Sequence, residues 1–362
     1  MQPSFKKDHH EEHEFSGNIY IFHSFDVGED INLEKIKESH AVVWQTLKLP
    51  KYFKNYHIPL AVKLPNAQNS PKCISSKIHN FGTISLTYKI PFSKPLTNLR
   101  TKLPSLENYY HKQSIADVES IYKAIKPYIA KPKFFQTRAS YLMIQVDPEP
   151  NVLDVVRLKE QYGGIIASAL RFEIQSLSEY QKNEILDAAI GYYRGDLIII
   201  DTEAAFVYDA EYEEVLDLFE FANIQHLELR YFDRVLDHQL NAIYEGRIIP
   251  RPLKAYLPFA GGLIADPVSE LGKLKVDISV ISERLESSIK FIGEPYFSEM
   301  YSILRDKMDL KNWRDSIDKK LAIINDIHVV YKDKVDTIRE DLLSVLIIIL
   351  IMIEVILGVM KL

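Results

Sequence analysis

The sequence LLSVLIIILIMIEVILGVMKL occupies residues 342–362 and carries one acidic residue, Glu354, within an otherwise apolar run. As an α-helix, 342–360 would be about 28 Å long, close to the ~30 Å hydrocarbon core of a bilayer. A helix in the core of a soluble protein rarely stays apolar on every face over this length. The stretch therefore predicts a transmembrane helix at 342–360.

The residues around this span predict its orientation. Two residues follow it, which indicates a tail anchor with the preceding chain in the cytosol. The basic residues Lys332, Lys334 and Arg339 before the span outnumber Lys361 after it, which favours the same orientation. We expect a single-pass membrane protein with most of the chain in the cytoplasm.

Glu354 belongs to one face of the predicted span. Steps of three and four residues place five positions on that face: Ser344, Ile347, Ile351, Glu354 and Gly358. Small residues let membrane helices approach closely, and polar residues hydrogen-bond across the contact. We expect the Glu354 carboxyl, in its neutral form, to bond a partner helix. Two alternatives are contact with the far headgroups and a proton or ion relay.

The composition of the whole chain is that of a globular protein. Its 362 residues are enough for about two domains, with 26% charged and 47% apolar residues. A net charge of -6 argues against nucleic-acid binding through a bulk basic surface. Cys73 is the single cysteine, so the soluble part is expected in a reducing compartment. The amino terminus is too polar for a signal peptide and too acidic for a transit peptide.

The sequence predicts an α+β fold in which a mixed-sheet domain precedes long antiparallel helices and the membrane helix. We expect a disordered tail at 1–16, the α+β domain at 17–209 and a helical hairpin or stalk at 210–341. In the α+β domain, predicted strands and helices alternate without the glycine-rich loops that bind phosphates. The sequence GDLIIIDTEAAFVYDAE, at 195–211, reads as a β-hairpin.

Several local patterns define elements within the predicted α+β domain. Asn32, Ser114 and Ser178 are each expected to cap a helix, and the last of these helices should close at Gly195. Residues 163–175, GGIIASALRFEIQ, favour a strand because glycines precede an alternating segment. We also expect a loop-rich insertion with one strand at 50–77, where proline and asparagine are frequent.

Long helices dominate the sequence after the predicted α+β domain. A helix at 210–246 is followed by a segment whose apolar residues are spaced as heptads and need a partner helix. The positions of this seam are Leu271, Leu274, Ile278, Ile281, Leu285 and Ile292. The last helix should begin near Trp313 and continue into the span, because no glycine or proline interrupts it before Gly358.

Polar residues interrupt the apolar pattern of the predicted helix at 210–246. They are Asn223, Gln225, His226, Glu228, Arg230 and Asp233. Because charged groups are costly to bury unless they are paired, we expect several of them to form a buried polar network between helices. A ligand or catalytic site is the alternative interpretation.

Two clusters contain the acidic or histidine side chains that can bind metal ions. Asp201, Glu203, Asp209 and Glu211 surround the predicted hairpin and could hold a hard cation, although aspartates in turns and at caps are commoner. The amino-terminal cluster HHEEH, at 9–13, lacks the spacing of a zinc protease. We assign no catalytic residue, no metal and no cofactor from the sequence.

Four segments resemble the domain-of-unknown-function 155 family, which includes proteins required for meiotic nuclear division. They are NIYIFHSFDVGEDINLEKI (18–36), IDTEAAFVYDAEYEEVLDLFEFANIQHLELRYFDRVLDHQL (200–240), EPYFSEMYSILRDKMDLKNWRDSI (294–317) and IIILIMIEVILG (347–358). The resemblance implies an α+β domain, helical segments and a final span with a glutamate that Glu354 matches. It implies no enzymatic activity and, in eukaryotic members, membrane-associated organisers of mitochondrial translation and nuclear division.

Together these features predict a tail-anchored membrane scaffold without catalytic activity. We expect it to form a homo-oligomer through stalk and span and to present the α+β domain to a cytosolic protein partner. Because a transit peptide is missing, the resemblance favours a bacterial member in the inner membrane. The alternatives are a membrane-tethered enzyme or small-ligand-binding domain, and a divalent-cation transporter-like protein.

Overall fold

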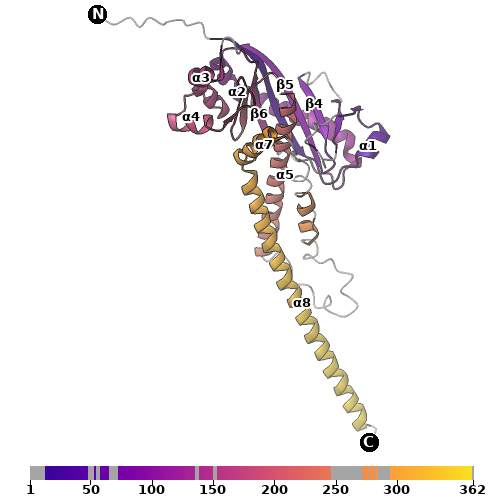
Figure 1. The fold of residues 1–362 in the computed structure, drawn as a ribbon. Helices are drawn as coiled ribbons and strands as arrows, with labels where there is room; N and C mark the ends of the chain where they lie inside the picture. Colours follow the sequence, from indigo (N-terminus) through magenta and orange to yellow (C-terminus); the bar gives the residue numbers. More distant parts are fainter. Residues whose placement is uncertain are drawn as a thin grey trace, which may run out of the picture. The chain divides into compact units, whose positions relative to one another are not determined.

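The computed structural model describes residues 13–47, 53, 58–64, 72–134, 138–149, 153–245, 272–276, 278–281, 283 and 294–360. The chain forms two compact units. The first comprises Met1–Glu228 with Arg284–Lys311, and the second comprises Leu229–Glu283 with Asn312–Leu362. A mixed sheet is followed by helices and by an apolar carboxy-terminal helix, so the predicted α+β class is confirmed (Figure 1).

The first unit is built on a nine-stranded sheet with the order β2-β3-β4-β5-β1-β6-β9-β8-β7 among the described residues. The long central strands are β1 (Phe15–Asp26), β5 (Thr83–Lys94) and β6 (Arg138–Val146). The others are β2 (Trp44–Gln45), β3 (Leu60–Val62), β4 (Cys73–Ile78), β7 (Ala189–Ile190), β8 (Leu197–Ile200) and β9 (Ala204–Tyr208). The β6–β9 pair is parallel and the remaining pairs are antiparallel, which makes the sheet mixed.

Helices cover both faces of this sheet. One face packs against α2 (Leu96–Ile125), α3 (Val155–Leu170) and α4 (Glu179–Leu186), and this layer holds the main apolar core. The opposite face packs against the first part of α5 (Glu213–Tyr244), where Tyr141 of β6 stacks on Phe219 with ring centroids 5.4 Å apart. The remaining helices are α1 (Leu33–Ser39), a short 3₁₀ turn (Lys126–Tyr128), α7 (Pro295–Lys307) and α8 (Leu310–Met360).

The central strand β1 is buried on both faces, but the two faces differ in chemistry. Ile19, Ile21 and Phe25 belong to the apolar core beside α2 and α3. The alternate positions include Ser24 and Asp26, which are buried under α5. Successive side chains of a strand point to opposite faces, so this alternation places polar groups in the α5 layer.

The strand prediction for 163–175 is wrong, because residues up to Leu170 belong to helix α3. Gly163 is buried in that helix, and a Cβ atom there would lie 2.7 Å from Cδ1 of Leu186. The glycine thus permits close packing of α3 against α4.

Two helix boundaries and one loop also differ from the sequence predictions. Helix α2 begins at Leu96, so Ser114 lies inside it and donates a hydrogen bond to the carbonyl of His111. The helix capped by Ser178 ends at Leu186 and not at Gly195. Strand β4 lies in the region predicted to be rich in loops, and β1 begins within the predicted tail, at Phe15.

Other predicted local features are confirmed. The side chains of Asn32 and Ser178 cap α1 and α4 by accepting hydrogen bonds from backbone amides in the first turn. Strands β8 and β9 form the predicted antiparallel hairpin. Strand β9 ends at Tyr208 and α5 begins at Glu213, and the compact first unit continues along α5 to Glu228.

The second unit contains the rest of α5 and most of α8. Asp233 of α5 accepts hydrogen bonds from Lys320 Nζ, at 2.6 Å, and from Ser316 Oγ, at 2.7 Å. In the predicted heptad seam Ile278 is buried, whereas Leu274 and Ile281 are half-buried. Leu271, Leu285 and Ile292 lie outside the described residues.

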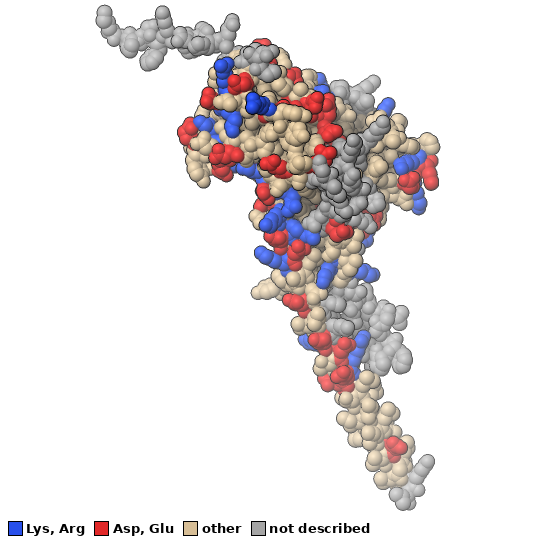
Figure 2. Space-filling model, in the orientation of Figure 1, with Lys and Arg blue, Asp and Glu red and all other residues tan. Residues whose placement is uncertain are grey.

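Helix α8 is 51 residues long and runs without a break into the predicted span. Among the described residues, one helical stretch, Asp336–Met360, is long and apolar enough to cross a membrane. Its 25 residues correspond to about 37 Å of helix, and the most apolar part of the stretch is not buried against the rest of the described chain. Figure 2 shows this end of α8 as a largely uncharged surface.

Candidate functional site

Polar and charged side chains line the contact between α5 and the sheet. We call this group the polar seam, and its members are Asp26, Lys77, His79, Thr83, Ser85, Asp217, Glu220, Asn223 and Glu228. All are buried except Asp217, which is half-buried. Spacings of three and eight residues place Asp217, Glu220 and Glu228 on one side of α5. The seam is the main concentration of buried charge between this helix and the sheet.

Lys77 is the cation at one end of the polar seam. Its Nζ atom lies 2.8 Å from Oδ1 of Asp217 and 2.5 Å from Oε2 of Glu220. Burial alone lowers the pKa of Lys77, but the two carboxylates outweigh it and raise the pKa above its ordinary value. Burial raises the pKa of Asp217, opposed by Lys77. The ammonium group is therefore held in its charged form between two acids.

A hydrogen-bonded chain continues from Glu220 into the sheet. Ser85 Oγ donates to Oε1 of Glu220 at 2.5 Å, and His79 Nε2 lies 3.0 Å from the same hydroxyl. Burial, helped by the charge of Lys77, lowers the pKa of His79 to about 3. Because the Ser85 hydroxyl uses its proton in the hydrogen bond to Glu220, it can only accept from His79, so the neutral imidazole donates to it from Nε2. His79 cannot act as a base toward Ser85 in this arrangement.

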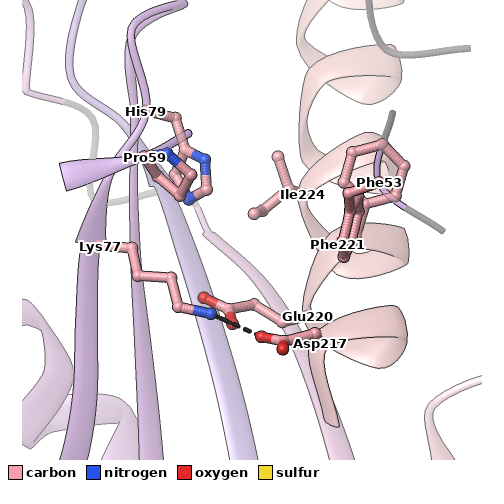
Figure 3. A pocket seen from close by; sticks show the side chains of 8 residues that line it. All are labelled: Phe53, Pro59, Lys77, His79, Asp217, Glu220, Phe221 and Ile224. Atoms are coloured by element: carbon pink, nitrogen blue, oxygen red, sulfur yellow. Dashed lines mark hydrogen bonds and ion pairs between the residues drawn. The ribbon is translucent and has the colours of Figure 1, made fainter. Parts of the chain in front are cut away.

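A small hollow opens beside Lys77 and His79 (Figure 3). Its lining residues are Phe53, Pro59, Lys77, His79, Asp217, Glu220, Phe221 and Ile224. The space is about 210 Å³ when the part open to solvent is counted, but its enclosed part holds about one water molecule. Typical ligand pockets are larger, roughly 300–1,000 Å³. The hollow suits a water molecule better than a substrate.

A second pair of acids, Asp26 and Glu228, lies elsewhere in the polar seam. Glu228 accepts a hydrogen bond from the Thr83 hydroxyl, and Asp26 Oδ1 accepts one from the Gly28 amide at 3.0 Å. Burial, and then the charge of Asp26, raises the pKa of Glu228 to about 8. Burial raises the pKa of Asp26 to about 7, although the Gly28 amide and Lys133 oppose this rise.

The predicted polar network of the helix at 210–246 is divided among several partners. Asn223 Nδ2 donates to Ser24 Oγ at 3.0 Å and to the carbonyl of Ala139 at 3.3 Å. Glu228 also binds the sheet, so these two candidates correct the expectation of a network between helices. Their positions face β1 and β5, because this part of α5 lies on the sheet.

The remaining candidates of that network contact helices or lie nearer the surface. Gln225 accepts a hydrogen bond from the Tyr301 hydroxyl of α7, and Asp233 binds α8 as described above. His226 and Arg230 are half-buried. Asp201, Glu228 and Arg230 do not line the hollow beside Lys77.

Two of the four hairpin carboxylates, Asp201 and Asp209, have structural partners. Asp201 is fully buried and ion-paired with Arg171, whose Nη2 atom lies 3.1 Å from Oδ1. Asp209 Oδ1 accepts a hydrogen bond from the Glu211 amide at 2.8 Å. Within the described ranges, three or more histidine, cysteine or acidic side chains nowhere gather as a metal site would require.

The predicted membrane-packing face lies on the exposed end of α8. Its five positions are Ser344, Ile347, Ile351, Glu354 and Gly358, and all are exposed. A Cβ atom at Gly358 would have no neighbouring atom within 4 Å. The five side chains lie together on α8, and the partner helix expected to bind them stays a prediction.

Sequence reasoning missed most of the polar seam. Lys77 and His79 fall in or next to a segment that was predicted to be mainly loops. Asp217 and Glu220 carried one usable signal, since they stand three residues apart among the apolar residues of an amphipathic helix. That spacing could have identified a buried acidic pair, but not the strand that supplies its cation.

The fold defines an α+β sheet domain followed by a helix that could span a membrane. The family model for "Uncharacterized protein MJ0711, N-terminal domain" matches residues 16–214, which contain the sheet apart from Phe15 at the start of β1. The chain belongs to this family. It is also 28% identical over 206 residues to "Uncharacterized protein MJ0711" of Methanocaldococcus jannaschii.

The match covers part of each protein. It spans 54% of this chain and 59% of the length of the Methanocaldococcus jannaschii relative. No solved structure matches the chain. The comparisons therefore support an uncharacterised family, while the resemblance to the domain-of-unknown-function 155 family and the bacterial origin stay predictions.

Proposed function

We propose that this protein is a membrane-held scaffold that binds a protein partner and has no catalytic activity of its own. The observation that carries the proposal is the exposed apolar stretch Asp336–Met360, which continues α8 without a break. In water this surface would be unfavourable, because soluble proteins rarely expose large contiguous apolar patches. A bilayer would cover it.

The chemistry of the polar seam supports a structural role for the sheet domain. Lys77 is neutralised by Asp217 and Glu220, and the Ser85 proton is engaged by Glu220. A nucleophile must reach its substrate, whereas the Ser85 hydroxyl is buried and bonded to both Glu220 and His79. The polar groups of the seam thus stabilise the packing of α5 on the sheet.

The scaffold would act on the cytoplasmic face of the membrane. We propose that α8 anchors the chain, that its Glu354 face associates with the same face of a second copy, and that the sheet domain contacts a cytosolic protein. The small and polar residues of that face support self-association, since such residues mediate helix packing in membranes.

Membrane attachment can be tested on the full-length chain with two matched pairs of substitutions. The double variant Ile349→Arg and Ile353→Arg adds charges to the apolar end of α8. The control, Ile323→Arg and Val330→Arg, adds equal charge to exposed apolar positions earlier in the same helix. Each variant is expressed in cells, and its membrane fraction is washed with high salt and floated on a density gradient.

The proposal predicts that wild type and control float with the lipid, whereas the first variant moves to the soluble fraction. An arginine at the centre of a membrane helix costs about 2.5–3.5 kcal/mol on insertion scales, so two should prevent stable insertion. If the first variant floats as completely as the wild type, α8 is not the anchor.

A further inference from the structure

Two pairs of acids in the polar seam are neutralised differently. Asp217 and Glu220 share the ammonium group of Lys77. Asp26 and Glu228 are 5% and 3% exposed, and within the described part of the chain neither forms an ion pair. Asp26 is paired with Thr83 in the β1–β5 register, and the Thr83 hydroxyl donates to Glu228, so the two carboxylates are neighbours. Two neighbouring carboxylates cannot both stay ionised at low cost in a buried site. The second pair therefore needs another source of positive charge.

The groups around this pair are few. Strand β5 contributes the Thr83 hydroxyl to Glu228, and the turn after β1 contributes the Gly28 amide to Asp26. The charged neighbours of Asp26 are Lys133, which lowers its pKa, and Glu29, which raises it. For Glu228 the charged neighbour is Asp26 itself. Lys133 thus acts on Asp26 from a distance and leaves Glu228 uncompensated.

One oxygen of the pair shows what is missing. Oδ2 of Asp26 is buried and has no hydrogen-bond donor among the described residues. A buried acceptor without a donor costs roughly 1–3 kcal/mol, so such atoms are rare in native proteins. A carboxylic acid O–H on the neighbouring Glu228 would supply both the missing donor and the missing positive charge. A single proton between the two acids satisfies both requirements.

We propose that Asp26 and Glu228 share a proton that holds α5 on the sheet, and that loss of this proton releases this part of α5 from the sheet. The position of the contact along α5 determines which part of the helix it controls. Glu228 is the residue at which the first compact unit ends along α5, and the second unit begins at Leu229. The shared proton would therefore control the contact between α5 and the sheet at the carboxy-terminal end of the first unit's part of α5.

The direction of the pH effect follows from the protons held by each form. Open, solvated carboxyl groups ionise near pH 4, whereas the closed pair keeps its proton up to about pH 8. Opening then releases at least one proton, so it becomes at least about tenfold more favourable per pH unit between these limits. Above about pH 8 both forms are ionised and the dependence ends.

Hydrogen–deuterium exchange on the full-length chain in detergent micelles tests this proposal. Amide protection in α5 around Glu228 is measured at several pH values and corrected for the intrinsic exchange rate. Wild type should lose at least about tenfold in protection per pH unit between about pH 5 and pH 8. Glu228→Gln should remove this slope, because the amide donates a hydrogen bond to Asp26 at every pH. The control Glu213→Gln changes an exposed acid of the same helix and should keep the wild-type slope.

A flat wild-type profile, or an unchanged slope in Glu228→Gln, would overturn the proposal. Infrared spectroscopy gives a second readout if Glu228→Gln fails to fold. A protonated carboxyl band should disappear between pH 6 and pH 9 in wild type and in Glu354→Gln, which separates it from the acid in α8. The band should be absent at both pH values when Asp26→Asn and Glu228→Gln are combined in the Glu354→Gln background. Persistence of the band in that combined variant would assign the proton elsewhere.

Discussion

Lys77 of β4 and Glu220 of α5 form an ion pair of 2.5 Å, although their side chains are only 7% and 6% exposed. Removing two charges from water is costly, and their attraction compensates for this only when the geometry is good and further hydrogen bonds are made. Here Asp217 and Ser85 supply those bonds. The pair therefore defines where α5 lies along the sheet, because a shifted helix would leave the charges uncompensated.

Lys77→Met should destabilise the protein by about 3–5 kcal/mol, because it leaves Glu220 buried without its cation. Denaturant unfolding of the full-length chain, followed by circular dichroism, measures this loss. The double variant Lys77→Met with Glu220→Gln should recover part of it, since no uncompensated charge remains at Glu220. If the double variant loses as much free energy of unfolding as the two single variants lose together, the two residues are not coupled.

Gly82→Ala should destabilise the first unit by at least about 2 kcal/mol, because alanine is strained at positive φ. Gly82 has φ 106°, and a Cβ atom there would lie 2.0 Å from the carbonyl oxygen of Gly28. The turn between β4 and β5 would have to move. The matched control is Gly195→Ala, where a Cβ atom meets nothing within 4 Å and stability should change by less than about 0.5 kcal/mol. Equal melting temperatures for the two variants would contradict this account.

His79 should make the protein less stable in acid. Its pKa is lowered from 6.5 to about 3 by burial and by Lys77, so the folded form excludes a proton that the unfolded chain binds. The free energy of unfolding should thus fall as the pH drops from 6.5 to about 3, by up to about 1.4 kcal/mol per pH unit. His79→Gln keeps a donor for Ser85 and should reduce this slope.

Urea unfolding at a series of pH values measures the effect of His79→Gln. Above pH 7 the variant provides its own control, because neutral histidine and glutamine both donate to the same hydroxyl. There the two proteins should differ little in stability. A variant that keeps the full wild-type slope in acid would assign the acid sensitivity to other groups.

The predictable part of this structure is the part encoded by local patterns. The apolar run of α8 and the caps at Asn32 and Ser178 act within a single helix, so the sequence alone identifies them. Leucine, isoleucine and alanine after Gly163 are compatible with either a strand or a helix. The packing of Gly163 against Leu186 decides between them, and that contact cannot be seen in the local sequence.

The polar seam was less predictable because its partners are far apart in the chain. Lys77 and Glu220 are separated by 143 residues, and Thr83 and Glu228 by 145. Without the order of the strands, the acids of α5 suggest helix partners, as was expected for Asn223 and Glu228. The sheet provides their hydrogen-bond partners, because Ser24 and the Ala139 carbonyl accept from Asn223 and Thr83 donates to Glu228 on the face that α5 covers.

The span face gives the last prediction, which concerns association of copies in the membrane. Gly358→Leu should weaken association most, because it blocks close approach of two helices at an open glycine. Glu354→Gln keeps a donor and an acceptor and should preserve the oligomer. Glu354→Leu removes the polar contact but also its burial cost, so the loss should be modest, on the order of 1 kcal/mol.

Cysteine crosslinking in native membranes ranks these three variants, with Ile353→Leu as a control on a different face of the same helix. Packing through the Glu354 face requires the order Glu354→Gln, then Glu354→Leu, then Gly358→Leu, from strongest to weakest crosslinking. Full crosslinking in Gly358→Leu together with lost cellular function in Glu354→Gln would reverse the interpretation. The carboxyl would then handle protons, since glutamine preserves its hydrogen bonds but cannot release a proton.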